Sequence, residues 1–206
     1  MSEHLYTFIN PCNTKHLQRI QQRLEEHGVI ALPMGTNWAF CCHYTSKKGI
    51  EKLRRLNPNH PDDRPFSIVC SDIAMISSIG SIGNQNYRTV NKILPGAFTI
   101  ILDSSRQLTK RLGERRQTVG VRIPAETLTL EIIQHCGHPL VATSVPMMPD
   151  GQVYTMGYQI MEEFGHNLDL VVDLGEEMPG TETTVLDLTG TEVIVIREGA
   201  GSLDLL

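Results

Sequence analysis

The segment "ALPMGTNWAF", residues 31–40, joins an apolar run to a proline, a glycine, a hydroxyl and an aromatic side chain. The overlapping stretch "GVIALP", residues 28–33, predicts a strand that leads into it. Packing alone does not require this mixture of residues at the end of a buried strand. We therefore expect the segment to hold a ligand at the end of that strand.

Seven later apolar runs are too short for helices and predict further strands: "FSIVC", "FTIILD", "VGVRIP", "PLVATSV", "LDLVVDL", "TVLDL" and "EVIVIRE". Continuous β-branched runs are typical of a sheet that helices cover on at least part of both faces. Helical spacing of apolar residues is predicted at 14–27, 46–56, 72–79, 85–94, 126–136 and 155–164. Thr14 is expected to cap the first helix and Gly28 to end it in the left-handed conformation.

The fold class is therefore predicted to be α/β. The strands are unevenly spaced, which argues against a regular βαβ repeat and favours a mixed, twisted sheet with helices packed around it. The 206 residues contain no internal repeat and no linker. We expect one domain over residues 1–206.

The composition is that of an ordinary soluble protein, with 40% hydrophobic and 20% charged residues and a net charge of -5. No apolar stretch approaches membrane-spanning length, and no basic and apolar leader opens the chain, so a cytoplasmic protein without a membrane partner is expected. The net charge does not favour nucleic acid. Basic residues nevertheless cluster in "KKGIEKLRR" and "KRLGERRQ", which leaves a local basic face open.

The five cysteines are odd in number, scattered and without a CxxC pair, which argues against a disulfide framework. Cys41 and Cys42 are followed by His43, a grouping that raises the question of a metal. Neighbouring residues on a strand point to opposite faces, so the two thiols could not readily share one ion. Buried thiols in a strand, with no protein-bound metal, are the prediction.

Polar residues interrupt or end several of the apolar runs, where a hydrophobic side chain would serve packing better. An arginine in a buried-looking strand costs several kcal/mol unless it meets an anion or a full set of acceptors. Two such arginines with a ring of hydroxyls indicate a pocket for phosphate or carboxylate. The residues are Thr36, Thr99, Arg122, Thr143, Ser144, Thr183, Thr184 and Arg197.

A purely structural interpretation stays open for each residue singly. Arg122 could pair with a buried carboxylate such as Asp187, and threonines form strands readily. The glycines of "GAG", residues 199–201, open no evident helix, so no glycine-rich nucleotide-binding motif is present.

Read in order, these segments resemble the YrdC/TsaC family, and its YciO branch most closely. "ALPMGTNWAF" is similar to the family's "PTDTxYGLG", and "LRRLNPNHPDDRPFSIV" to "IKGRPxxKPLxIL". "LPGAFTIIL", "VGVRIP" and "PLVATSVPMMPDG" are similar to "LPGPxTxIL", "xVRxP" and "PLxSTSANxSG". "TETTVLDL" and "VIVIREGAG" are similar to "PSTVVDL" and "xxILRxGA". Each motif is weak alone, and their order along nearly the whole chain is specific.

The resemblance implies a YrdC-type sheet with a concave groove lined by basic residues. Family members make L-threonylcarbamoyladenylate from threonine, bicarbonate and ATP, releasing pyrophosphate, and the product serves the modification of an adenosine in tRNA. Members are also associated with double-stranded RNA. ATP is thus expected as a substrate, with magnesium arriving on its phosphate oxygens.

Carried over to this chain, the resemblance implies a role for each polar residue. Thr36 would meet the amino acid, Arg122 would clamp its carboxylate, and Thr183 or Thr184 would close that end of the pocket. Thr99, Thr143, Ser144 and Arg197 would bind the nucleotide. Arg55 and Arg64 would neutralise the triphosphate as the catalytic arginines.

Departures from the family pattern predict that the pocket holds something different from the parent substrates. Met34 and Gly35 replace a threonine and an aspartate, Trp38 a tyrosine, Asn57 an arginine, Ala142 a serine and Pro146 an asparagine. Two functions follow: a carbamoyladenylate-forming enzyme, or a non-catalytic protein that binds tRNA or double-stranded RNA. The second depends on basic residues of exposed faces, namely Lys47, Lys48, Lys52, Arg54, Lys110, Arg111, Arg115 and Arg116.

Overall fold

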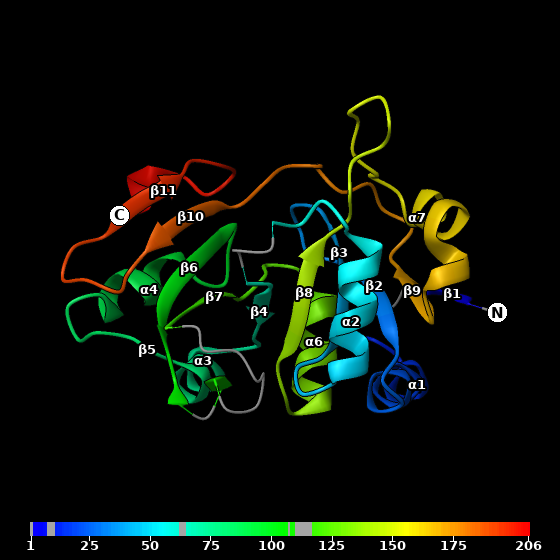
Figure 1. Ribbon diagram of the computed structural model, residues 1–206, viewed down its shortest axis with the longest axis horizontal. Helices are drawn as coiled ribbons and strands as arrows, with labels where there is room; N and C mark the ends of the chain where they lie inside the picture. Colours follow the sequence, from blue (N-terminus) through cyan, green and yellow to red (C-terminus); the bar gives the residue numbers. More distant parts are fainter. Residues whose placement is uncertain (1, 8–10, 62–64, 107, 110–116) are drawn as a thin grey trace.

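The strand predicted at 28–33 is β2 (Val29–Pro33), and residues 34–37 turn it into the antiparallel strand β3 (Trp38–His43). The computed structural model describes residues 2–7, 11–61, 65–106, 108–109 and 117–206. Over these residues an 11-stranded mixed sheet carries helices on both faces (Figure 1). The predicted α/β class and mixed sheet are confirmed.

The remaining strands are β1 (Glu3–Tyr6), β4 (Ser67–Val69), β5 (Gly80–Ser81), β6 (Phe98–Ser104), β7 (Thr118–Arg122), β8 (Leu140–Ser144), β9 (Leu170–Asp173), β10 (Thr184–Asp187) and β11 (Ile194–Arg197). The helices are α1 (Thr14–Glu25), α2 (Lys47–Leu56), α3 (Ile73–Ile79), α4 (Tyr87–Ile93), α6 (Thr127–Cys136) and α7 (Gly157–Phe164), with short 3-10 turns η1 (Gly165–Asn167) and η2 (Leu203–Leu205). The sheet runs in the order β1-β9-β2-β3-β8-β4-β7-β6-β10-β11, and β5 pairs with β6 outside this path.

Two apolar layers form on the two faces of this sheet because neighbouring strand residues point in opposite directions. On one face Phe40 and Cys42 lie in a cluster with Leu53 of α2. On the other face Ile30 and Cys41 lie in a cluster with helices α1 and α6. In Figure 1 helix α2 lies in front of the sheet and α6 behind it.

The ends of the first helix differ from the prediction. Asn13, and not Thr14, caps α1, because its side-chain oxygen accepts the Lys15 N–H at 2.9 Å. The left-handed residue after the helix is His27, with φ of 64°, and not Gly28. Gly28 is needed for another reason: a Cβ there would overlap the Arg23 carbonyl. The predicted end of α2 before Pro58 is confirmed, since Asn57 is its C-cap.

Strand β1 was not predicted, because only four residues of it pair, in parallel, with β9. The buried Asp173 of β9 holds this short strand through a 2.8 Å contact with His4 Nε2. None of the described helices is long and apolar enough to cross a membrane.

Candidate functional site

A cleft of about 620 Å³ lies on the face of the sheet that carries α1 and α6, and extends from β3 to β11. The residues of its floor share one face of the sheet, because residues paired on neighbouring strands lie on the same face. The pairs are Val69 with Arg122, Ile101 with Gly120, and Thr99 with Val185. This volume is within the usual range of small-molecule sites. Residues between β9 and β10 cross the upper edge of the sheet in Figure 1, and Thr181 to Thr183 of this segment also line the cleft.

Arg122 of β7 lies half-buried in the lining of this cleft. Its Nη2 donates to the Met34 carbonyl at 3.3 Å and to Thr36 Oγ1 at 3.1 Å, and its Nε is buried without a hydrogen-bond partner. Burial lowers the pKa of this guanidinium to about 10. The alternative pairing with Asp187 is wrong, because that carboxylate accepts from the N–H and the hydroxyl of Thr189. The guanidinium thus lacks a carboxylate partner among the described residues.

The turn at 34–37 brings Thr36 to Arg122. Gly35 allows the turn through a positive φ of 75°, and Met34 N–H closes it by donating to the Asn37 carbonyl at 3.0 Å. Thr181 N–H donates to the Thr36 carbonyl at 3.0 Å and fixes the turn from the other side. Thr36 is consequently held over the floor of the cleft.

Hydroxyl groups line the cleft in two hydrogen-bonded sets. Thr99 of β6 and Thr183 share a hydrogen bond of 2.8 Å. Asn57, at the end of α2, donates from Nδ2 to Thr143 Oγ1 at 2.9 Å and to the Ser144 carbonyl at 3.1 Å. Asn57 itself lines the cleft.

Arg197 lies at the far end of the cleft in a different environment from Arg122. The four residues of β11 are exposed, so the prediction of a buried arginine there is wrong. Its Nη1 pairs with Glu182 at 2.9 Å, and its Nη2 donates to the Thr183 carbonyl at 2.9 Å. The apolar residues of this strand are exposed at the edge of the sheet.

Seven of the residues predicted from the sequence line this one cleft: Thr36, Thr99, Arg122, Thr143, Ser144, Thr183 and Arg197. Thr184 does not, because it is fully buried and donates to the Gly201 carbonyl at 2.7 Å. Arg55 lies on the exposed face of α2 outside the lining, and Arg64 falls outside the described residues. The roles assigned to these residues stay predictions.

Several lining residues were not proposed as ligand contacts. Glu182 and Gly120 belong to the site although the motifs drew no attention to them. Alternation along "TVGVR" would have indicated Gly120, because it lies two residues before Arg122 and shares its face.

The five cysteines form no disulfide bond. Cys41 and Cys42 are fully buried in β3 on opposite faces, as predicted. Burial raises the pKa of the Cys42 thiol to about 12. Within the described ranges, no group of three or more His, Cys, Asp or Glu side chains could hold a metal ion.

The basic residues proposed for RNA binding are described only in part. Lys47, Lys48 and Arg54 are exposed on α2, and Lys52 pairs with Asp169 at 3.2 Å. Lys110, Arg111, Arg115 and Arg116 lie outside the described residues.

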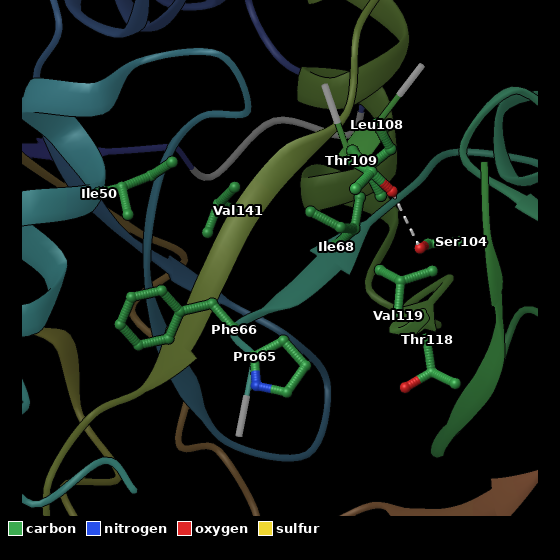
Figure 2. Close-up of a pocket in the computed structure, with 10 residues that line it drawn as sticks. All are labelled: Ile50, Pro65, Phe66, Ile68, Ser104, Leu108, Thr109, Thr118, Val119 and Val141. Carbon is green, nitrogen blue, oxygen red and sulfur yellow. Dashed lines mark hydrogen bonds between the residues drawn. The ribbon is translucent and has the colours of Figure 1, made fainter. Parts of the chain in front are cut away.

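A second pocket lies on the opposite face of the sheet and is mostly apolar (Figure 2). Ile68, Val119 and Val141 form its walls, and Ser104 and Thr109 share a hydrogen bond of 3.3 Å at its edge. Its volume of about 30 Å³ is that of a single water molecule. We regard it as a packing gap beneath α2.

Comparison with known proteins identifies the family. A family model named for Sua5, YciO and YrdC, with the description "Telomere recombination", matches residues 22–199. An uncharacterized protein of Haemophilus influenzae is 28% identical over 98% of both chains. The uncharacterized protein YciO of Escherichia coli K12 is 30% identical over 96% of this chain and 97% of its own. The threonylcarbamoyl-AMP synthase of Pyrococcus abyssi is 22% identical over 88% of this chain, which spans only 53% of that relative.

Solved structures show the same relationship. The crystal structure of E. coli YciO superposes with a TM-score of 0.89 at 25% identity, covering 100% of this chain and 99% of that one. The structure of P. abyssi Sua5 in complex with L-threonine superposes with a TM-score of 0.82 at 20% identity, covering 97% of this chain and 57% of that one. These findings confirm the predicted family, its YciO branch and the fold type.

Proposed function

This chain belongs to the Sua5, YciO and YrdC family, and we propose that it binds a nucleotide and a small carboxylate side by side in the cleft. The observation that carries the proposal is Arg122, a half-buried arginine whose buried Nε has no hydrogen-bond partner and which pairs with no carboxylate among the described residues. A charge in this position is costly unless an anion joins it. The planar group suits a carboxylate, which can accept two parallel hydrogen bonds.

The nucleotide would occupy the part of the cleft between Asn57 and Arg197. Thr99, Thr143 and Thr183 offer hydroxyls there, and Asn57 offers an acceptor. Arg197 and its partner Glu182 are partly exposed, so phosphate oxygens could compete for the guanidinium. Two relatives bind ligands of these classes: one Sua5 structure is a complex with L-threonine, and a HypF structure is in the phosphate- and nucleotide-bound form.

The chemistry that we propose is carbamoyladenylate formation. The amino group of an amino acid combines with bicarbonate to give a carbamate and water. A carbamate oxygen then attacks the α-phosphorus of ATP, the bond from this phosphorus to the bridging oxygen breaks, and pyrophosphate leaves. Such a reaction needs no nucleophilic side chain, because positioning and charge stabilisation lower its barrier. Magnesium would arrive on the triphosphate oxygens.

The altered motifs make slow turnover the expectation. Pro146 and Ala142 offer fewer hydrogen bonds than the asparagine and serine of the family pattern. A lost donor of this kind costs about 10²- to 10³-fold in rate.

Pyrophosphate release in the presence of ATP, bicarbonate and an amino acid tests the proposal. Release should require all three components and should fall to background in Arg122→Met. A matched variant outside the cleft, Lys48→Met, should retain the activity, since this residue is exposed on α2. Equal release by the wild type and Arg122→Met would remove the proposed reaction.

Binding of double-stranded RNA or tRNA is a second candidate. The supporting observation is the exposed basic side chains of α2, a helix whose last residue is followed by Asn57 of the cleft. Binding through phosphate contacts should weaken steeply with added salt. Titration of an RNA duplex at low and high salt, with Lys47→Glu and Lys48→Glu combined as the variant, tests this function. An affinity for RNA that changes neither with salt nor in the variant would reject this function.

A further inference from the structure

Asn57 joins the end of α2 to the end of β8 in the lining of the cleft. Its Nδ2 donates to the Ser144 carbonyl at 3.1 Å and to Thr143 Oγ1 at 2.9 Å. A carbonyl oxygen only accepts hydrogen bonds, so the contact with Ser144 requires the nitrogen of the amide in this position and not its oxygen. Both hydrogens of Nδ2 are therefore used, one by the Ser144 carbonyl and the other by the Thr143 hydroxyl.

The direction of the second bond fixes the role of the Thr143 hydroxyl. An amide nitrogen only donates, so Thr143 Oγ1 is the acceptor and its own hydrogen points elsewhere. Among the described residues no group accepts that hydrogen. Thr143 is 5% exposed and lines the cleft, so its hydroxyl hydrogen is a buried donor without a described partner. A buried donor in this state is unfavourable until an acceptor binds to it.

Thr36 follows the same rule at the turn between β2 and β3. The Arg122 guanidinium only donates, so Thr36 Oγ1 accepts their 3.1 Å bond and keeps its own hydrogen for another partner. No described residue accepts that hydrogen, and Thr36 is also buried in the lining. The pair of Thr99 and Thr183 differs, because the bond between them uses one of their two hydroxyl hydrogens. The cleft thus presents two hydroxyls that are set to donate.

We propose that Asn57 is a positioning residue of the nucleotide site, which directs the Thr143 hydroxyl hydrogen onto an acceptor atom of the nucleotide. This inference rests on the proposed function and deepens it. The acceptor is a phosphate oxygen, or an oxygen or nitrogen of the nucleoside that carries no proton. Asn57 is one of the departures of this chain from the family pattern, so the arrangement belongs to the altered pocket.

Two substitutions of similar shape separate the direction of the hydrogen bond from its presence. Asn57→Leu removes the bond and leaves the Thr143 hydroxyl able to rotate towards a ligand. Asn57→Asp replaces the donor by acceptor oxygens, so the hydroxyl hydrogen turns to the new carboxylate and no longer reaches the ligand. Calorimetry with a non-hydrolysable ATP analogue should show binding weakened less than about 3-fold in Asn57→Leu. Asn57→Asp should bind at least about 10-fold more weakly than Asn57→Leu.

The negative charge of the aspartate requires two controls. Asn59→Asp adds the same charge at an exposed position outside the lining and should change the affinity less than about 2-fold. In the Thr143→Val background the hydroxyl is absent, so Asn57→Asp and Asn57→Leu should differ only through charge. The difference between these two variants should then fall below about 3-fold.

Three results would overturn the role of Asn57. The first is equal affinity of Asn57→Leu and Asn57→Asp, and the second is a difference of the same size with and without the Thr143 hydroxyl. If a variant of Asn57 does not fold, Thr143→Val should bind at least about 10-fold more weakly than Thr143→Ser, which keeps the hydroxyl. Equal binding by these two variants is the third.

Failure of the proposed function would look different. A wild type that does not bind the ATP analogue would reject the nucleotide site itself. Repetition of the series with adenosine locates the acceptor, because the effect of Asn57→Asp persists if the acceptor belongs to the nucleoside and disappears if it belongs to a phosphate.

Discussion

Arg122 of β7 donates to the hydroxyl of Thr36 at 3.1 Å across the two intervening strands β4 and β8. The β2–β3 turn therefore folds over the sheet, and a strand residue and a loop residue separated by 86 positions share one site. This hydrogen bond uses one side of the guanidinium and leaves Nε buried without a partner. The cleft is thus built around a charge that the described residues do not neutralise.

Thr183 and Thr184 are neighbours in the sequence, but Thr183 lines the cleft and Thr184 is buried in the fold. Substitution of each by valine should therefore affect ligand binding in one case and stability in the other. Thr184→Val should lower the free energy of unfolding by about 1–3 kcal/mol, because the Gly201 carbonyl and the Gly199 N–H lose their buried partner. Thr183→Val should weaken nucleotide binding with little effect on stability. Chemical denaturation and calorimetry measure the two effects, and the reverse pattern would place the ligand at Thr184.

Gly120 in the cleft floor should tolerate alanine and reject larger side chains. A Cβ at this position would make ordinary contacts, 3.6 Å from Thr99 Cγ2 and 3.7 Å from Ser67 Oγ, so packing does not require the glycine. Glycine in a strand often marks a close approach by a ligand. We expect Gly120→Ala to fold and bind, and Gly120→Leu to fold but to bind nucleotide at least about 10-fold more weakly.

The matched control for this substitution is Gly190→Leu. Gly190 is exposed, and no atom lies within 4 Å of the position of its Cβ. The Gly190→Leu substitution should leave nucleotide binding unchanged. Full nucleotide affinity in Gly120→Leu would show that the ligand does not cross this part of the floor.

His43 should make the protein sensitive to acid. Burial, and then the neighbouring His138 ring at 3.8 Å, lower its pKa from 6.5 to about 4, against an opposing effect of Glu25 and with a further lowering by His27. Between these two pKa values the unfolded chain binds a proton that the folded chain does not. The free energy of unfolding should therefore decrease as the pH falls from 6.5 towards 4.

Denaturant unfolding at pH 7 and pH 5 checks this effect. His43→Asn keeps an acceptor for the Thr45 N–H, which His43 Nδ1 accepts at 3.1 Å, and should flatten the dependence on pH. His166→Asn, at an exposed position, should not. An unchanged slope in His43→Asn would mean that other groups cause the acid sensitivity.

Much of the fold could be predicted from short-range patterns. Runs such as "FTIILD" and "PLVATSV" gave β6 and β8 because continuous apolar residues are typical of strands covered on both faces. The short edge strand β1 escaped prediction, since its four residues are stabilised by pairing with β9, far away in the sequence. The cap at Asn13 was misplaced by one residue because two adjacent side chains are both suitable caps.

Site residues could be predicted where the residue type alone indicates a need for a binding partner. Arg122 stood out because a charge between Val121 and Ile123 demands a partner, and the structure shows that none of the described acids supplies it. Arg197 followed the same pattern but lies in an exposed edge strand, a position that depends on sheet order and not on local sequence. Glu182 is likewise recognised only through its ion pair with Arg197.

Thermal unfolding of the wild type and Arg122→Met, with and without threonine and an ATP analogue, tests the account most directly. Because the half-buried guanidinium has no anionic partner among the described residues and its Nε is buried without a hydrogen bond, Arg122→Met should unfold at the same temperature as the wild type or higher. The ligands should raise the unfolding temperature of the wild type, and threonine should cause no further increase in the variant. A destabilised variant whose response to threonine equals that of the wild type would contradict the role of Arg122 as the anion site.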